Sequence, residues 1–256
     1  MSDSLLVLHG FTGSSSMWDE VCEGLPPHLR IFAIDLLGHE LSRLGEHTPG
    51  VATHPWSFEE EIDRLGDALI ALPEPAHVCG YSLGARVALS LAVRHPGRCA
   101  SLTLIGVHPG LEDTAEREAR RRDDDQLAAL LRGLGMEWFV RYWERRALFA
   151  SQSQLDTARL QAQRVRRLCH KAEGLARSLE VLGLGRMPAY WSALPKLTMP
   201  VRLLVGAEDA KFAAIAERIR TLRPATEVQV VDGAGHNLVL ERPDVVRATL
   251  DVVLGA

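Results

Sequence analysis

A serine flanked by glycines is the residue in this sequence that is best placed to do chemistry. Gly80-Tyr81-Ser82-Leu83-Gly84 ends an apolar run and precedes a segment whose apolar residues have helical spacing. A serine at a sharp turn from strand to helix exposes its hydroxyl above the carboxyl edge of a sheet, and small flanking residues let the two segments pass each other. The pattern therefore predicts that Ser82 carries an activated hydroxyl; an ordinary serine at a helix start is the structural alternative.

An activated serine needs a base, and the base needs an acid that orients it. Asp209 and His236 each follow a later strand-like run, at positions where a doubly wound sheet places its ligand-facing loops. We therefore predict a triad of Ser82, Asp209 and His236. The neighbouring Glu208 is the alternative acid, and a solvated loop histidine is the alternative interpretation of His236.

The segment Leu8-His9-Gly10-Phe11-Thr12-Gly13 follows the first strand-like run. A glycine there lets the chain turn, so that the Phe11 amide can join the Leu83 amide as a pair of donors to a developing oxyanion. Removing one such donor typically costs about 3–4 kcal/mol of transition-state stabilisation. We predict an oxyanion hole made by Phe11 and Leu83, with His9 supporting the loop rather than acting as a second base.

Short apolar runs alternate with segments of helical spacing, both early in the chain and after Pro200. The expected strands are Leu5–His9, Arg30–Asp35, Ala76–Gly80, Ser101–Val107, Val201–Gly206 and Glu227–Val231. The expected helices are Phe58–Leu72, Leu83–His95, Phe212–Leu222 and Pro243–Leu254. This alternation predicts an α/β fold with a mostly parallel, doubly wound sheet.

Residues 112–186 show helical spacing and no strand signal, which predicts an all-helical cap inserted after the fourth strand, between core ranges 1–111 and 187–256. His108-Pro109-Gly110 is the expected hinge, and direct contact of His108 with substrate is the alternative. The cap holds 15 Lys and Arg against 12 Asp and Glu, a net of +3, so the rest of the chain carries −4 − 3 = −7. A basic insert indicates a lid over an anion site, although arginine is common throughout the chain.

The composition excludes several classes of protein. Hydrophobic residues make up 46% of the chain, which is too many for a disordered protein, and a net charge of −4 argues against a nucleic-acid partner. No basic region precedes the short N-terminal apolar run, and no run of 18 apolar residues occurs, so we expect neither a signal peptide nor a membrane contact. Four scattered cysteines fit a reducing cytoplasm and no metal site. We expect no cofactor, and a monomer or small homo-oligomer.

Several longer stretches carry a family resemblance. They are His9-Gly-Phe-Thr-Gly, Gly80-Tyr-Ser-Leu-Gly-Ala-Arg86, Gly106-Val-His108-Pro-Gly-Leu111, Arg117–Arg122, Trp143 with Phe149-Ala-Ser, and Asp209-Ala-Lys211-Phe212. Together they resemble the α/β-hydrolase fold, and within it the MenH branch of menaquinone biosynthesis, the 2-succinyl-6-hydroxy-2,4-cyclohexadiene-1-carboxylate synthases. Ala85 departs from the pattern, because many relatives have a second glycine there.

The resemblance implies a lyase that removes pyruvate from 2-succinyl-5-enolpyruvyl-6-hydroxy-3-cyclohexene-1-carboxylate. The triad would then act as a base relay, in which Ser82 takes the proton with help from His236. The alternative is a small-molecule serine hydrolase acting on an ester, lactone or carbon–carbon bond, because the triad alone cannot separate the two. A non-catalytic receptor would not need the triad.

The implied substrate is a small tricarboxylate, for which guanidinium groups offer charge-assisted, bidentate hydrogen bonds. The residues expected to bind it are Tyr81, Arg86, Arg120, Trp143, Phe149, Arg167 and Lys211. Arg86 lies one helical turn after Ser82, whereas Arg120 and Arg167 are chosen by their match to the family. Arg122 competes with Arg120, and Arg164 competes with Arg167. The aromatic residues would form an apolar wall, although aromatics at helical spacing are also typical of a core.

Overall fold

A computed structural model describes residues 3–39 and 57–255 of the chain. Its centre is a six-stranded sheet in the order β2-β1-β3-β4-β5-β6, and every pair of neighbouring strands is parallel. The strands are β1 (Ser4–Leu8), β2 (Arg30–Ile34), β3 (Ala76–Tyr81), β4 (Cys99–Ile105), β5 (Val201–Gly206) and β6 (Glu227–Val231). The chain leaves β1 for one edge of the sheet and then returns to β3 on its other side. The loops that follow β1 and β3 therefore meet at a topological switch point, where α/β sheets bind ligands.

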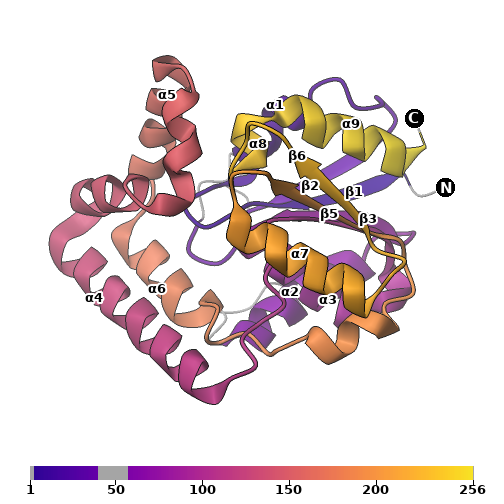
Figure 1. Cartoon of the computed structure of the whole chain (residues 1–256), viewed down its shortest axis with the longest axis horizontal. Helices are drawn as coiled ribbons and strands as arrows, with labels where there is room; N and C mark the ends of the chain where they lie inside the picture. The colour runs from indigo at the N-terminus through magenta and orange to yellow at the C-terminus, as the bar shows by residue number, and fades with distance from the viewer. Residues whose placement is uncertain (1–2, 40–56, 256) are drawn as a thin grey trace.

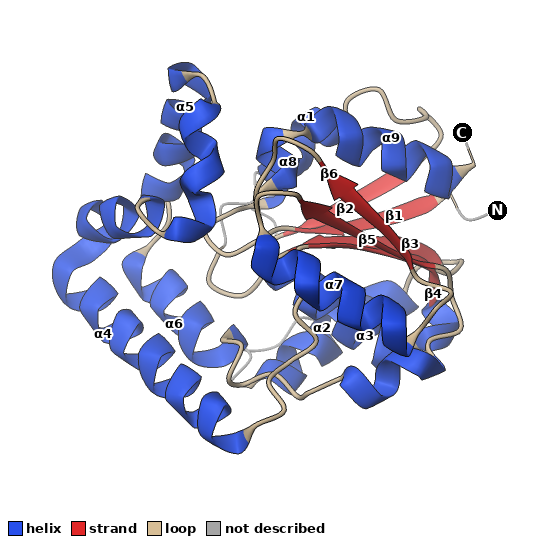
Figure 2. Cartoon of the chain, in the orientation of Figure 1, coloured by secondary structure: helices blue, strands red, loops and turns tan. Residues whose placement is uncertain are grey.

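Helices cover both faces of the sheet, as Figures 1 and 2 show. The helices of this core are α1 (Asp19–Cys22), α2 (Phe58–Ile70), α3 (Leu83–Arg94), α7 (Ala210–Leu222), α8 (Leu238–Glu241) and α9 (Pro243–Leu254). Successive strand residues point to opposite faces. Leu6 and Leu8 of β1 accordingly pack with α2, α3 and α7, whereas Leu5 and Val7 pack with α1, α8 and α9. The predicted α/β class with a doubly wound sheet is confirmed.

Most element boundaries agree with the sequence-based expectation to within two residues. β5, β6 and α9 have the expected bounds. β4 begins two residues earlier than expected and ends at Ile105, because Gly106 has a φ of +60° and turns the chain. Cys79 and Cys99 are buried in β3 and β4, as expected of small apolar side chains.

The part of the chain between β4 and β5 that spans residues 112–186 lies beside the sheet, on the side away from both termini (Figure 1). It contains α4 (Thr114–Glu144), the 3₁₀ helix η3 (Ala147–Gln154), α5 (Thr157–Leu168) and α6 (Ala172–Leu182). Residues 106–200 are all described and contain no strand. We call residues 112–186 the cap segment. It has its own apolar cluster, which includes Leu131 and Phe139 of α4 and Leu175 of α6. The division into core and cap domains stays a prediction, and its core ranges include residues 1–2, 40–56 and 256, which lie outside the described residues.

Within the described parts of the chain, every helix is too short or too polar to cross a bilayer.

Candidate active site

Ser82 occupies the turn between β3 and α3 with a strained backbone. Its φ of 51° and ψ of −106° are rarely adopted by a residue with a side chain, and such strain costs on the order of 1–3 kcal/mol. A Cβ atom at Gly84 would lie 2.1 Å from the carbonyl oxygen of Leu8, and one at Gly80 would lie 2.3 Å from the carbonyl oxygen of Gly84. The two glycines of the motif are therefore required sterically, because β1, β3 and α3 meet at this point.

The structure brings Ser82, His236 and Asp209 together. Ser82 Oγ and His236 Nε2 are 2.9 Å apart, and His236 Nδ1 lies 2.6 Å from Asp209 Oδ2. The Asp209 contact fixes the tautomer in which Nδ1 carries the proton and Nε2 accepts from the serine hydroxyl. Glu208, the alternative acid, is exposed. His236 is buried and passes close to Gly106, where a Cβ atom would lie 2.7 Å from His236 Cε1.

The loop after β1 turns tightly beside Ser82. The Gly13 amide donates to the Gly10 carbonyl over 2.9 Å, and Thr12 between them has a φ of 67°. His9 is buried beneath this turn: its Nδ1 lies 2.9 Å from the Gly10 carbonyl oxygen and its Nε2 accepts from the Leu36 amide over 3.0 Å. Both ring nitrogens are therefore occupied, which agrees with a supporting role rather than that of a second base.

The two amides expected to form the oxyanion hole are available. Among the hydrogen bonds of residues 3–39 and 57–255, none has the Phe11 or the Leu83 amide as its donor. Leu83 is the first residue of α3, so its amide also contributes to the positive end of that helix. The arrangement can stabilise an oxyanion held next to Ser82.

A cavity of about 470 Å³ opens between α5, the loop after β1 and the turn before α8. It is lined by Phe11, Thr12, Gly13, Ser14, Ser16, Met17, Asp19, Glu20, Glu23, Tyr81, Phe149, Gln163, Arg166, Arg167, Asn237, Val239 and Leu240. Four of the predicted site residues, Phe11, Tyr81, Phe149 and Arg167, are in this lining. Ser82 and His236 are not, but Tyr81 and Asn237 are their neighbours in the chain.

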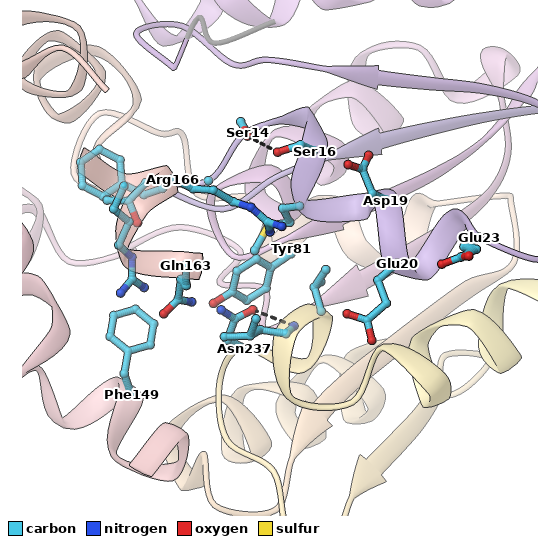
Figure 3. Close-up of a pocket in the computed structure, with 17 residues that line it drawn as sticks. Ser14, Ser16, Asp19, Glu20, Glu23, Tyr81, Phe149, Gln163, Arg166 and Asn237 are labelled. Atoms are coloured by element: carbon cyan, nitrogen blue, oxygen red, sulfur yellow. Dashed lines mark hydrogen bonds between the residues drawn. The ribbon is translucent and has the colours of Figure 1, made fainter. Parts of the chain in front are cut away.

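Figure 3 shows the two sides of this cavity: Gln163, Arg166 and Phe149 of the cap segment face Asp19, Glu20 and Glu23 of the α1 region.

Arg167 is the one of the predicted cap arginines that lines this cavity. It is 3% exposed; its Nη1 lies 3.4 Å from Glu144 Oε1, and its guanidinium lies 5.3 Å from the centre of the Phe149 ring. Burial lowers the pKa of Arg167, and the Glu144 carboxylate opposes that effect. Arg164, the alternative, also pairs with Glu144 but does not line the cavity.

Trp143 lies outside the lining of this cavity, as Ser82 and His236 do. That its ring forms part of the wall around the substrate stays a prediction. Its ring packs at 5.2 Å from the Phe11 ring and 5.9 Å from the Phe149 ring, measured between centroids. Trp143 therefore supports two residues that line the cavity, because its spacing on α4 directs it into the aromatic cluster of the cap segment.

Arg86 and Arg120, two more of the predicted substrate-binding residues, have partners within the protein. Arg86 Nη1 donates to the Leu182 carbonyl over 2.8 Å, and Arg120 Nε lies 2.9 Å from both carboxylate oxygens of Asp124. Asp124 follows Arg120 by one helical turn, which makes this ion pair local. Neither arginine lines the cavity. Arg122, the competitor of Arg120, is exposed.

These two arginines and Lys211 form a second basic group around His108. Burial, together with the nearby cations Lys211, Arg86, Arg120 and Arg218, lowers the pKa of His108 to about 4. Burial lowers the pKa of Arg86 to about 9. Lys211 itself is exposed and outside the cavity lining. Of the predicted substrate-binding residues, Tyr81, Phe149 and Arg167 thus line the cavity, whereas Arg86, Arg120 and Lys211 lie near His108.

Sequence reasoning missed several polar residues of the cavity, among them Arg166, Gln163 and Asn237. Arg166 and Gln163 share with Arg167 the face of α5 that borders it, and Asn237 follows His236 directly. Helical spacing around Arg167 was the signal for Gln163, which lies four residues earlier. No group of three or more His, Cys, Asp and Glu side chains within residues 3–39 and 57–255 is arranged to hold a metal ion.

Comparison with known proteins was consistent across sequence and structure. Residues 5–249 match the model of the Alpha/beta hydrolase family. A protein of Bacillus subtilis (strain 168) named putative 2-succinyl-6-hydroxy-2,4-cyclohexadiene-1-carboxylate synthase is 35% identical over 94% of this chain and 86% of its own. The synthase of that name from Citrobacter koseri is 33% identical over 93% of this chain and 88% of its own.

Among solved structures, MenH from S. aureus has a TM-score of 0.90 with 29% identity, covering 100% of this chain and 94% of the other. A thermophilic esterase from Thermogutta terrifontis has a TM-score of 0.79 with 26% identity, covering 98% of this chain and 89% of its own. The chain belongs to the alpha/beta hydrolase family, alongside the 2-succinyl-6-hydroxy-2,4-cyclohexadiene-1-carboxylate synthases.

Proposed function

We propose that this chain is a carbon–oxygen lyase of menaquinone biosynthesis. It converts 2-succinyl-5-enolpyruvyl-6-hydroxy-3-cyclohexene-1-carboxylate into 2-succinyl-6-hydroxy-2,4-cyclohexadiene-1-carboxylate and pyruvate. The observation that carries the proposal is the hydrogen-bonded series Ser82–His236–Asp209 in a chain whose relatives bear the synthase name.

The names of substrate and product define the chemical step. A proton leaves ring carbon 2, the 3,4 double bond becomes a 2,4-diene, and the bond between carbon 5 and the enolpyruvyl oxygen breaks. Carbon 2 also carries the succinyl ketone, so negative charge develops on that ketone oxygen as the proton leaves. The leaving group takes the electron pair of the broken bond and departs as the enolate of pyruvate, which is then protonated.

Each residue of the site has a role in this step. Ser82, deprotonated by His236, takes the carbon 2 proton, and Asp209 holds the imidazole in the required tautomer. The Phe11 and Leu83 amides donate to the ketone oxygen as it becomes charged, an interaction that strengthens in the transition state. The proton held by His236 then returns to the leaving enolate.

Cations of the cap segment and of the core suit the three carboxylates of this substrate. Arg167 lies in the cavity beside Tyr81 and Phe149, and we assign it to one carboxylate. Arg86, Arg120 and Lys211 of the second basic group are assigned to the others. Tyr81 and Phe149 bound the ring of the substrate, and Trp143 supports Phe149. We place the reaction in the cytoplasm, with a small molecule as partner and without nucleic acid or membrane.

The test follows pyruvate release. The substrate is generated in situ from isochorismate and 2-oxoglutarate by the preceding synthase, and pyruvate is measured with lactate dehydrogenase. We expect rapid release by the wild type, and a fall of at least about 10³-fold for Ser82→Ala with an unchanged thermal transition. A p-nitrophenyl ester is tested in parallel. Rapid ester hydrolysis without pyruvate release would refute the lyase and support the hydrolase.

A further inference from the structure

Thr12, in the loop that carries the proposed oxyanion donor Phe11, is held from two sides by histidines. The Thr12 amide donates to His39 Nε2 over 3.1 Å, and His170 Nε2 donates to the Thr12 carbonyl over 3.2 Å. His39 follows β2 in the core, whereas His170 belongs to the cap segment, between α5 and α6. Both imidazoles are buried, at 0% and 5% exposure.

Thr12 needs such support because its backbone is strained. Thr12 and Ser82 are the two residues other than glycine, among those described, with a positive φ. The left-handed conformation costs a residue with a Cβ atom about 1–2 kcal/mol, and a β-branched threonine adopts it rarely. Left alone, the peptide groups on either side of Thr12 would relax, and the Phe11 amide would turn with them.

The hydrogen bonds of His39 leave it one protonation state. Its Nδ1 lies 3.0 Å from the Leu37 carbonyl, which can only accept, so Nδ1 carries the proton and Nε2 is a bare acceptor for Thr12. Burial lowers the pKa of His39 well below its ordinary value, with His9 and His170 acting in the same direction. His39 is therefore neutral, and its acceptor stays directed at the loop.

The contact between core and cap at these histidines is closely fitted. Gly38 and Gly174 meet backbone to backbone: a Cβ atom at Gly38 would lie 2.0 Å from the Gly174 carbonyl oxygen. The His39 and His170 rings pack edge to face with centroids 5.5 Å apart. Arg167 lies three residues before His170. The same turn of the cap segment therefore places the Arg167 cation in the cavity and the His170 imidazole against the loop after β1, where it donates to the Thr12 carbonyl.

From this geometry we infer that His39 and His170 are positioning residues for the oxyanion hole, and that seating the cap segment on the core sets the direction of the Phe11 amide. The inference rests on the proposed function in that it takes Phe11 as an oxyanion donor. The histidines touch neither substrate nor triad; they act through the two peptide groups of Thr12. In this account the cap segment takes part in transition-state stabilisation as well as in substrate binding.

The test compares variants that keep or remove the relevant nitrogen. His170→Gln retains a donor near the position of Nε2 and His39→Gln retains an acceptor, whereas His170→Leu and His39→Leu retain neither. His95→Leu is the matched control, because His95 packs at the far end of α3, against Gly66. We expect the leucine variants to lower kcat for pyruvate release by about 10- to 100-fold with KM within twofold, below the ~10²–10³-fold loss of a whole oxyanion donor. The glutamine variants should recover most of this loss, and His95→Leu should keep the wild-type kcat.

A readout that does not depend on activity accompanies the kinetics. Amide hydrogen exchange of the Phe11–Gly13 peptide should speed up at least tenfold in His170→Leu and stay unchanged in His95→Leu. Wild-type kcat in His170→Leu, equal losses in the Gln and Leu variants, or unchanged exchange would overturn the inference. Failure of the proposed function looks different: the wild type itself would release no pyruvate, and the exchange result and ester hydrolysis, which needs the same oxyanion hole, would still test the two histidines.

Discussion

His170 gives a pH dependence of stability whose size can be worked out from the structure. It is 5% exposed and donates to the Thr12 carbonyl, and burial lowers its pKa from 6.5 to about 4. This value already includes His9 and Arg167, which lower the pKa, and the hydrogen bond to Thr12 and the Asp35 carboxylate, which raise it. The folded chain therefore holds His170 neutral, whereas the unfolded chain protonates it below its ordinary pKa. Stability that is present above pH 6.5 is lost as the pH falls towards 4.

Between pH 7.5 and pH 5, the lowered pKa of His170 reduces the free energy of unfolding by about 2 kcal/mol, because one pKa unit corresponds to about 1.4 kcal/mol. His170→Gln keeps a donor for Thr12 but cannot be protonated, so it should lose about 2 kcal/mol less than the wild type over this interval. The measurement is urea unfolding at both pH values, with the midpoints compared at constant m-value. His28→Gln is the control, because His28 is exposed. Equal losses for the wild type and His170→Gln would refute the description of a buried, neutral imidazole.

Three further outcomes are expected. Asp209→Asn should lower kcat by about 10³–10⁴-fold without shifting the thermal transition, because the amide stabilises the wrong tautomer of the histidine; a tenfold loss or less would contradict the triad. Arg167→Ala should raise KM for the tricarboxylate at least about tenfold, and more than Arg120→Ala does, while hydrolysis of a neutral ester is unchanged in both; the reverse order in steady-state kinetics would contradict this assignment. Gly84→Ala should abolish soluble folding, because the new Cβ atom would lie 2.1 Å from the Leu8 carbonyl oxygen. Gly133→Ala is the matched control: a Cβ atom there meets open space at a helical position, so thermal unfolding should show a stability about 0.5–1 kcal/mol higher.

The sequence predicts the sheet and the triad well because both depend on local rules. Strands end where polar loops begin, and a serine between two glycines at such an end has few structural alternatives. The doubly wound topology then brings the loops carrying Asp209 and His236 to the same edge as Ser82. Even the choice between Asp209 and Glu208 follows from position, since the residue nearer to the start of α7 caps that helix: Asp209 Oδ1 accepts from the Phe212 amide.

The partners of the arginines were not predictable in the same way. Arg86 bonds to the carbonyl of Leu182, 96 residues later in the chain, and nothing in the local pattern of α3 reports that contact. The spacing of four between Arg120 and Asp124 is typical of an ion pair on a helix, whereas the family resemblance favours contact of Arg120 with the substrate. His39 and His170 lie 131 positions apart in numbering, and only packing of the cap segment on the core reveals that both act on Thr12.

Arg167 and Arg120 are each paired with an acidic residue of the protein, and the two ion pairs differ in how readily the arginine can bind a substrate carboxylate instead. Glu144 is shared by Arg164 and Arg167, so a substrate that takes Arg167 leaves Glu144 with one partner. Asp124, in contrast, is 5% exposed, and burial raises its pKa despite Arg120. A substrate that took Arg120 would leave this carboxylate buried without that partner, which typically costs about 3–5 kcal/mol unless it takes up a proton or water. Of these two paired arginines, Arg167 is therefore the one that a substrate carboxylate can take at the smaller cost, and we expect recognition of the anion to begin in the cavity that it lines.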